Sequence, residues 1–261
     1  MIPKKIHYCW LSGEPFPEKV RQCMDSWRRV MPDYEWKLWD REAFDVEASV
    51  PYVREAVAHR KWAFAADYIR LYALYVEGGV YLDSDVRVLR PFDTFLHHTF
   101  FTSMEYHPFM VERDRTLRLL DAEGRRMVEA YPSGIQLQAA VMGAERGCPF
   151  VKRLLDWYAD KHLVRPDGTL GLDVIAPQIY ARVAEDYGLR YVDADQPLAG
   201  GIMVYRSEIF AGNRREQTAA SYAIHYCENS WVSRSLWERI RHYGRFFCFL
   251  LKSKVRHFFS R

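Results

Sequence analysis

Two aspartates, Asp83 and Asp85, are the residues whose type and spacing point most directly to chemistry. They stand two positions apart, directly after the apolar residues 80–82. In an extended backbone such side chains lie on the same face, so both carboxylates can converge on one ligand. Carboxylate oxygens suit a hard divalent cation, and such a cation can carry a diphosphate. The pair therefore predicts a metal-diphosphate site, although an Asp-any-Asp pattern also occurs by chance in solvated turns.

The segment before this pair predicts how the aspartates are positioned. Residues 62–77 have the pattern of a helix, and Asp67 and Arg70 lie three apart on one of its faces. That pair is either an intrahelical ion pair or part of a site. Gly78 and Gly79 supply a left-handed helix end and a tight turn into a short strand. A helix, a turn and a strand thus lead to the aspartates.

The rest of the chain predicts an α/β domain. A strand at 5–10, a helix at 18–31 and a strand at 34–39 form a βαβ unit, which predicts a parallel sheet with ligands beyond the carboxyl ends of its strands. Further strands are expected at 99–104, 136–142, 189–192, 202–205 and 222–226, and helices at 149–162 and 173–187. Residues 105–131 have no clear assignment. We expect one domain over residues 1–231 and a tail over 232–261.

Charge and cysteine usage exclude several classes of protein. The five cysteines include no CxxC pair, which argues against a zinc knuckle or a disulfide framework and favours a reducing compartment. The start of the chain lacks the apolar core of a signal peptide. There is no GxGxxG after the first strand, no GxxxxGK[ST] and no nucleophile elbow.

The basic charge belongs to the tail. From Trp231 onward there are eight Lys or Arg residues against the single acid Glu238, while the remainder has 29 basic and 33 acidic residues. This distribution argues against a nucleic-acid-binding protein. The tail has the composition of a basic amphipathic helix on an anionic membrane, or else of a helix packed on the domain or in a dimer. We expect a cytoplasmic protein, peripheral at the inner face of a bacterial membrane.

Four ordered segments together resemble a known family. They are IPKKIHYCW (2–10), SWRRVMPDYEWKLWD (26–40), FAADYIRLYALYVEGGVYLDSDVRVL (64–89) and IHYCENSW (224–231). In combination they resemble the DXD-containing sugar transferases of glycosyltransferase family 32, which include bacterial capsule and lipopolysaccharide enzymes, yeast mannosyltransferases and clostridial toxin domains. The resemblance implies a GT-A-like, Rossmann-type nucleotide-sugar-binding domain with a mostly parallel central sheet.

The resemblance also implies roles for particular residues. Trp10 matches an aromatic residue that stacks on the nucleobase; otherwise it is a core tryptophan at a strand end. Asp67 and Arg70 match a pair that contacts the donor sugar and diphosphate. Asp83 is expected near ribose and sugar hydroxyls, and Asp85 on Mn²⁺ or Mg²⁺. A late loop implied to close over the metal and diphosphate contains His225, Asn229, Ser230 and Trp231. Of these, Asn229 is a weaker metal-ligand candidate, and His225 is equally well explained as a hydrogen-bonded core histidine.

The implied reaction is a retaining transfer of a hexose or N-acetylhexosamine from a nucleotide sugar, a UDP-sugar in the first place. A cation and Arg70 would stabilise the leaving diphosphate, and nearby carboxylates the oxocarbenium-like sugar. The implied acceptor is a glycan, linked to polyprenyl diphosphate, in capsule, exopolysaccharide or lipopolysaccharide O-antigen synthesis. Two alternatives stay open: a toxin-like transferase acting on protein hydroxyls, and a non-catalytic metal-binding or membrane-associated scaffold.

Overall fold

The computed structural model describes residues 1–214 and 216–226. Its helices are α1 (Glu18–Val30), α2 (Pro51–Ala58), α3 (Trp62–Glu77), α4 (Pro108–Arg113), α5 (Pro149–Tyr158) and α6 (Ala176–Ala184). Its strands are β1 (Lys5–Cys9), β2 (Glu35–Trp39), β3 (Gly79–Leu82), β4 (Val86–Val88), β5 (Phe100–Tyr106), β6 (Ile135–Leu137), β7 (Val141–Ala144), β8 (Gln196–Leu198), β9 (Ile202–Tyr205), β10 (Phe210–Ala211) and β11 (Ala223–His225). Asn229, Ser230, Trp231 and the expected tail helix lie outside the described residues. Within the described part, no helix combines the length and apolar composition needed to cross a bilayer.

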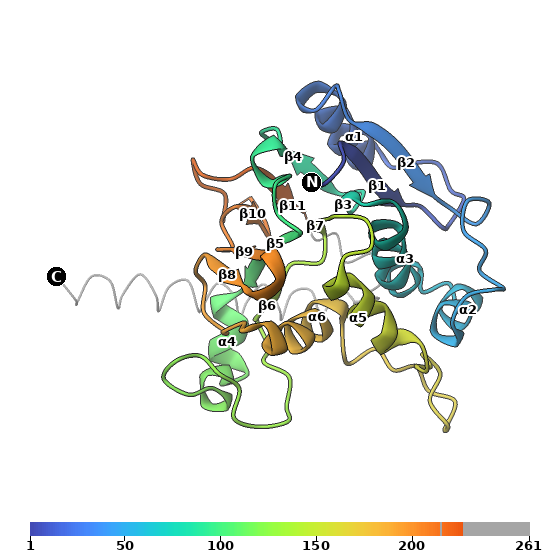
Figure 1. Cartoon of the computed structure of the whole chain (residues 1–261). Coiled ribbons are helices and arrows are strands. Elements are labelled where there is room, and N and C mark those ends of the chain that lie inside the picture. Colours follow the sequence, from blue (N-terminus) through green and yellow to red (C-terminus); the bar gives the residue numbers. More distant parts are fainter. Residues whose placement is uncertain (215, 227–261) are drawn as a thin grey trace.

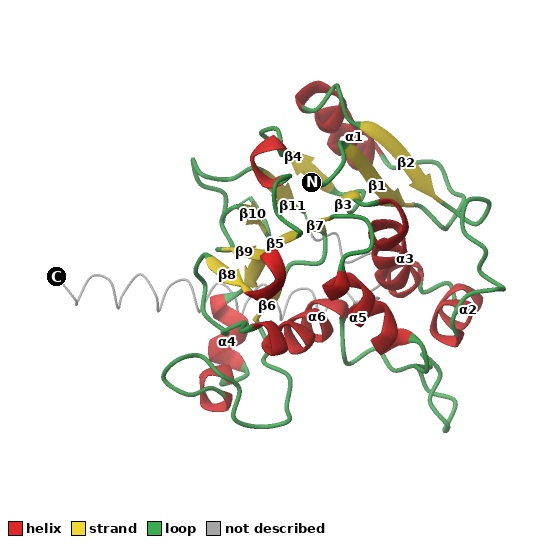
Figure 2. Cartoon of the chain, in the orientation of Figure 1, coloured by secondary structure: helices red, strands yellow, loops and turns green. Residues whose placement is uncertain are grey.

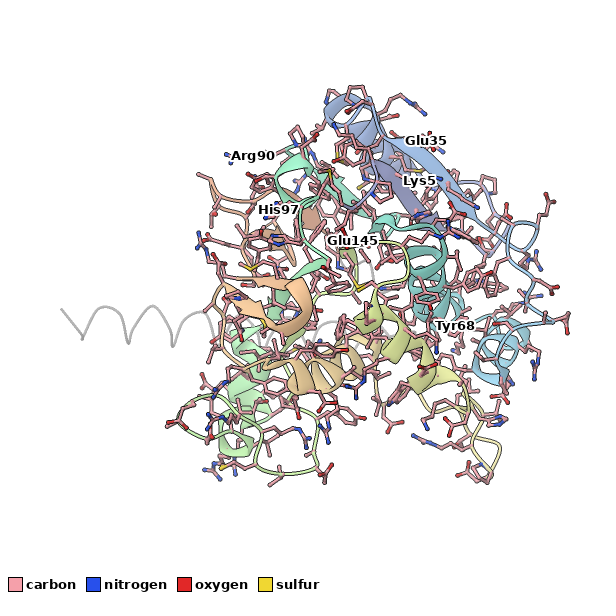
Figure 3. The ribbon with its side chains drawn as sticks, viewed as in Figure 1. Lys5, Glu35, Tyr68, Arg90, His97 and Glu145 are labelled. Carbon is pink, nitrogen blue, oxygen red and sulfur yellow. The ribbon has the colours of Figure 1, made fainter. Side chains whose placement is uncertain are left out.

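The central sheet contains eight of the described strands, in the order β2-β1-β3-β7-β5-β9-β8 with β6 beside β5 (Figure 1). β1 pairs in parallel with β2 and β3, and β5 pairs in parallel with β9, whereas β6, β7 and β8 are antiparallel to their neighbours. The first pairing sets Lys5 opposite Glu35, which Figure 3 shows side by side. Since β1, β2, β3, β5 and β9 run in one direction, the predicted α/β class with a mostly parallel sheet is confirmed.

The sheet is buried on both faces. Val80 and Leu82 belong to one apolar core, together with Trp27 of α1, whereas Tyr81 belongs to a second core. Helices α2, α3, α5 and α6 contribute to that second core (Figure 2). Successive side chains of a strand point to opposite faces, so residues 80–82 must all be apolar or aromatic to satisfy both cores. The uninterrupted apolar run before Asp83 has this cause.

The Gly-Gly turn has the predicted form, and a buried histidine fixes it. Gly78 and Gly79 have φ values of +68° and +121°. The Nε2 atom of His7 lies 2.8 Å from the Gly78 carbonyl oxygen, and the Trp39 indole donates to His7 Nδ1 at 3.0 Å. A Cβ atom on Gly79 would lie 2.7 Å from the Lys5 carbonyl oxygen. The start of β3 is therefore tightly packed against β1.

The prediction of one strand over residues 136–142 is wrong, because the chain bends between β6 and β7. The Thr102 hydroxyl lies 2.7 Å from the carbonyl oxygen of Gln138 and 2.9 Å from that of Val141. The chain therefore leaves the edge of β5 and re-enters the sheet as β7, between β3 and β5.

The prediction of a strand over residues 189–192 is also wrong. The Gln196 side chain satisfies this backbone, accepting from the Arg190 N–H at 2.9 Å and donating to the carbonyl oxygens of Arg190 and Val192 at 3.1 Å each. With these groups satisfied, no partner strand is required. Helices α2 and α4 and the short strand β10 were not expected from the sequence.

Candidate active site and metal centre

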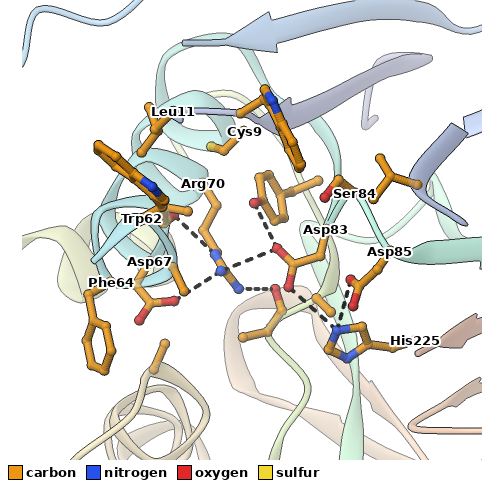
Figure 4. Close-up of a pocket in the computed structure, with 18 of the residues that line it drawn as sticks. Cys9, Leu11, Trp62, Phe64, Asp67, Arg70, Asp83, Ser84, Asp85 and His225 are labelled. Carbon is orange, nitrogen blue, oxygen red and sulfur yellow. Dashed lines mark hydrogen bonds and ion pairs between the residues drawn. The ribbon is translucent and has the colours of Figure 1, made fainter. Parts of the chain in front are cut away.

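A cavity of about 660 Å³ opens beyond the carboxyl ends of β1 and β3, beside the first turns of α3. This is where ligands of open α/β sheets are expected. Six predicted site residues that the structure describes line this one cavity: Trp10, Asp67, Arg70, Asp83, Asp85 and His225. Figure 4 shows the five charged or titratable side chains in a row, with Arg70 between Asp67 and Asp83, and with Asp85 and His225 at the far end.

Asp83, Asp85 and His225 form a candidate metal centre. Each offers one ligand atom, and these atoms lie within 4.8 Å of one another. His225 Nε2 is 3.2 Å from Asp85 Oδ1 and 3.9 Å from Asp83 Oδ2. β11 brings His225 here because it pairs antiparallel with β4, with His225 opposite Val86. Two carboxylates and an imidazole are a donor set that could hold a divalent metal ion, since carboxylates suit Mg²⁺ and Mn²⁺ and imidazole suits several first-row metals. His225 thus lies in the cavity beside Asp85, with its side chain 18% exposed.

Arg70 occupies the floor of the cavity, with its side chain only 5% exposed. Its Nη2 lies 3.0 Å from Asp67 Oδ1 and 3.4 Å from Asp83 Oδ1. Its Nη1 donates to the Ala139 carbonyl oxygen at 2.7 Å, and its Nε to that of Ala66 at 3.2 Å. The guanidinium is thus held in one orientation between two carboxylates.

Asp67 forms an intrahelical ion pair with Arg70 and also lines the cavity. An ion pair and a place in a site are therefore compatible for this pair. Burial raises the pKa of Asp67 to about 7, although Arg70 opposes the shift. The Tyr180 hydroxyl donates to the Asp67 carbonyl oxygen at 2.9 Å, which ties α6 to this point of α3. Asp67 is therefore a carboxyl group that exchanges its proton near neutral pH.

Trp10 lies at the mouth of the cavity rather than in a core. Its indole donates to the Glu14 carbonyl oxygen at 2.6 Å, and its ring centroid is 4.8 Å from that of Phe16. Its neighbour Cys9 also lines the cavity, but burial raises the pKa of that thiol to about 12. Cys9 is thus a neutral thiol, and Trp10 offers an aromatic surface to a ligand, as does Trp62 in the same lining.

Among the cavity residues not found from the sequence, Tyr81 and Glu105 bear most directly on the site. The Tyr81 hydroxyl donates to Asp83 Oδ1 at 2.9 Å, and its ring lies 4.9 Å from the Arg70 guanidinium. The signal was present, because Tyr81 is two positions before Asp83 and so shares its face of the strand. Glu105 also lines the cavity, near the carboxyl end of β5. It lies one residue beyond the strand predicted at 99–104, at the edge where ligands were expected.

Glu105 is held by a charged histidine. His107 Nε2 lies 2.8 Å from Glu105 Oε1, and His107 Nδ1 lies 3.5 Å from Glu216 Oε1. Burial opposes the charge, but the hydrogen bonds to both glutamates outweigh it and raise the pKa of His107 to about 10. Burial likewise disfavours the Glu105 carboxylate, but His107 more than compensates and lowers the pKa of Glu105. The cavity thus has a fixed carboxylate apart from the candidate metal centre.

An α/β domain with a carboxylate pair of this kind after a central strand has the form of a DXD-type glycosyltransferase. Residues 17–102 match the family described as a glycosyltransferase sugar-binding region containing a DXD motif. The resemblance predicted from the sequence is therefore confirmed over these residues.

Two curated proteins and one solved structure illustrate the relationship. Inositol phosphoceramide mannosyltransferase 3 of Schizosaccharomyces pombe is 31% identical over 157 residues, covering 59% of this chain and 36% of that protein. Subversion of eukaryotic traffic protein A of Legionella pneumophila is 29% identical over 117 residues, covering 35% of this chain and 18% of that protein. The PaToxG glycosyltransferase structure is similar with a TM-score of 0.46 and 17% identity, covering 71% of this chain and 69% of that one. The chain spans well under half the length of both curated relatives.

Proposed function

We propose that this protein is a metal-dependent, retaining glycosyltransferase that moves a hexose or N-acetylhexosamine from a nucleotide sugar to a glycan. The donor that we propose first is a UDP-sugar. The observation that carries the proposal is the convergence of the Asp83–Asp85–His225 cluster and the Asp67–Arg70 pair in one cavity. A single ligand that contains a diphosphate and a sugar can contact both groups.

Each side chain then has a distinct task. Asp85, His225 and Asp83 would hold Mn²⁺ or Mg²⁺, and the metal would neutralise charge on the diphosphate leaving group. Asp83 is fixed by Tyr81 and Arg70, so it can accept from donor hydroxyls without reorienting. Arg70 places its positive charge near the leaving group at no cost in reorganisation.

The remaining roles concern the two ends of the donor. Trp10 would stack on the nucleobase at the mouth of the cavity. Asp67 and Asp83 would stabilise positive charge that develops on the sugar. Asn229, Ser230 and Trp231 follow His225 in the chain and, on the family resemblance, would close over the metal and diphosphate. No residue is assigned as a covalent nucleophile.

For the acceptor we propose a glycan on polyprenyl diphosphate, in the synthesis of a bacterial surface polysaccharide such as capsule or lipopolysaccharide. The support is the basic, aromatic composition of residues 232–261, which suits the inner face of an anionic membrane. Full-length protein in which the eight tail Lys and Arg residues are replaced by Gln should lose binding to anionic liposomes in a sedimentation assay. Equal sedimentation of this variant and the natural chain would contradict the membrane role.

A second candidate function is transfer to a protein hydroxyl. Its support is the resemblance to toxin domains of the family, and one relative in Legionella is named for subversion of eukaryotic traffic. The two candidates share the donor site and differ only in the acceptor. Donor assays therefore test the shared part first.

The decisive experiment is calorimetry with UDP and GDP, with and without Mn²⁺. We expect metal-dependent binding of one nucleotide that Asp85→Ala abolishes and Asp186→Ala, an exposed ion-pair residue far along the chain, leaves intact. Donor hydrolysis over a panel of UDP- and GDP-sugars then identifies the donor; GDP-mannose is included because one relative is named a mannosyltransferase. Absence of binding, or binding that does not depend on metal, would instead favour a non-catalytic scaffold.

A further inference from the structure

A second cavity, of about 530 Å³, adjoins the candidate metal centre and has a strongly basic lining. It is formed by α1, β4 and the chain on either side of β11 (Figure 1). Its charged lining residues are four cations, Lys19, Arg29, Arg87 and Arg214, and one acid, Asp25. The acid lies 3.8 Å from Arg28, an arginine outside the lining, so its charge is already shared.

The four cations reach this cavity from three separate parts of the chain. Lys19 and Arg29 lie on α1 with Gln22 and Asp25, at spacings of three, three and four residues, and so share one helical face. Arg87 stands between the buried residues Val86 and Val88 of β4 and therefore points away from their core. The fold itself thus collects positive charge at one place.

Tyr226 organises two of these cations. The ammonium group of Lys19 lies 4.4 Å from the centroid of the Tyr226 ring, and the Arg214 guanidinium lies 5.4 Å from it. Arg214 Nε also donates to the Tyr226 hydroxyl at 3.3 Å. By contrast, Arg29 and Arg87 make no ion pair with any other described residue. Convergent like charges repel one another, and an anion between them removes that cost.

The second cavity is joined to the donor cavity. Lys19 lines both cavities. Arg87 follows the metal-site residue Asp85 by two positions, and the Tyr226 N–H donates to the Asp85 carbonyl oxygen at 3.2 Å. An anion bound here therefore lies beside the centre where the sugar would be transferred, but apart from Trp10, Arg70 and the candidate metal ligands that would hold the donor.

We propose that this second cavity binds the phosphoryl groups of the acceptor, a glycan carried on a diphosphate. Arginine side chains bind phosphate oxygens with paired N–H donors, and three of the four cations are arginines. The inference rests on the proposed transfer reaction. It adds a residue set that fixes the acceptor end, with Lys19 at the boundary between the two substrates.

The test uses the full chain and inorganic pyrophosphate, titrated by calorimetry in the absence of divalent metal. We expect binding that weakens with added salt and that Arg29→Gln combined with Arg87→Gln reduces by about tenfold or more, the loss typical of charged hydrogen bonds. Arg21→Gln is the matched control, since Arg21 is on the same helix but pairs with Glu18 outside the cavity. Asp85→Ala should keep pyrophosphate binding while losing metal-dependent nucleotide binding.

The outcomes separate this site from the donor site. Pyrophosphate binding that the double variant retains, or that Asp85→Ala abolishes, would overturn the acceptor-phosphate assignment. Loss of affinity for phosphatidylglycerol vesicles without loss for pyrophosphate would overturn it in favour of a membrane contact. If nucleotide binding proves independent of metal while pyrophosphate binding still depends on Arg29 and Arg87, the proposed transfer fails and the anion site stands. Thermal melting of each variant confirms that these surface substitutions leave the fold intact.

Discussion

Replacing Arg70 by methionine tests whether the row of charges in the cavity is a structural unit. Methionine has a similar length, so the packing of α3 is largely kept while the positive charge is removed. The change leaves Asp67 and Asp83 without their shared partner, and it leaves the Ala139 carbonyl oxygen without its donor at 2.7 Å. We expect Arg70→Met to be strongly destabilising and to abolish nucleotide binding.

The size of the loss follows from burial. The side chains of Arg70 and Asp67 are only 5% and 14% exposed, so water replaces the lost partner poorly. Removing one member of a buried ion pair typically costs about 3–5 kcal/mol. With an unfolding entropy of about 2.1 cal/mol/K per residue, this corresponds to a fall in melting temperature of roughly 6–9 °C for a chain of 261 residues.

Urea denaturation of the natural chain, Arg70→Met and the double variant Arg70→Met, Asp67→Asn measures this effect. The double variant should recover part of the loss at pH 8, above the pKa of Asp67, because the amide carries no charge to leave unpaired. As a control, Arg153→Met removes an exposed partner of Asp186 and should leave the denaturation midpoint unchanged. A single variant as stable as the natural chain, or no recovery in the double variant, would refute the view that Arg70 compensates two carboxylates.

Two further predictions concern the same segment. Because burial raises the pKa of Asp67 to about 7, its stabilising contribution is complete below about pH 4 and is lost as pH rises through 7. The urea midpoint of the natural chain should therefore fall between pH 5 and pH 8, and Asp67→Asn should remove this fall. An unchanged fall in the variant would contradict the assigned titration. Gly79→Ala would place a Cβ atom 2.7 Å from the Lys5 carbonyl oxygen at a φ of +121°, so it should lower the free energy of unfolding by more than about 2 kcal/mol. Gly147→Ala is also at positive φ but meets no atom within 4 Å, so it should lower that free energy by only about 1 kcal/mol. Equal unfolding free energies for the two variants would contradict the close approach of β3 to β1.

The segment from α3 to β4 was predictable because its local signals agree. Helical periodicity in residues 62–77, the two glycines after it and the apolar run that follows predict a helix, a turn and a buried strand. The structure has a helix, a turn through two glycines of positive φ and a strand buried on both faces, in that order. Side-chain alternation then brings Asp83 to the cavity beside Arg70. The βαβ unit at the start of the chain was predictable for the same reason.

The parts that sequence reasoning missed depend on side-chain hydrogen bonds that no periodic pattern of residues encodes. Residues 189–192 alternate as a strand would, with Leu189 and Tyr191 buried, yet their backbone bonds the Gln196 side chain and the Ala184 and Gly124 carbonyl oxygens instead of a strand. Glu105 gave no signal beyond its place after a predicted strand, because its charge is fixed by His107, which in turn pairs with Glu216 more than 100 residues later. Such partners cannot be read from a local pattern.

The most consequential miss is the bend that divides residues 136–142, because this bend holds the site together. The Asp83 N–H donates to the Ala140 carbonyl oxygen at 2.9 Å, while Arg70 donates to the carbonyl oxygen of the adjacent Ala139 at 2.7 Å. A continuous strand would turn these two neighbouring carbonyls in opposite directions across the sheet, and one residue pair could not serve both groups. Asp83 and Arg70 are thus hydrogen-bonded to adjacent residues of the same bend. Catalysis by fixed charges requires that geometry before the substrate arrives, and here the backbone supplies it.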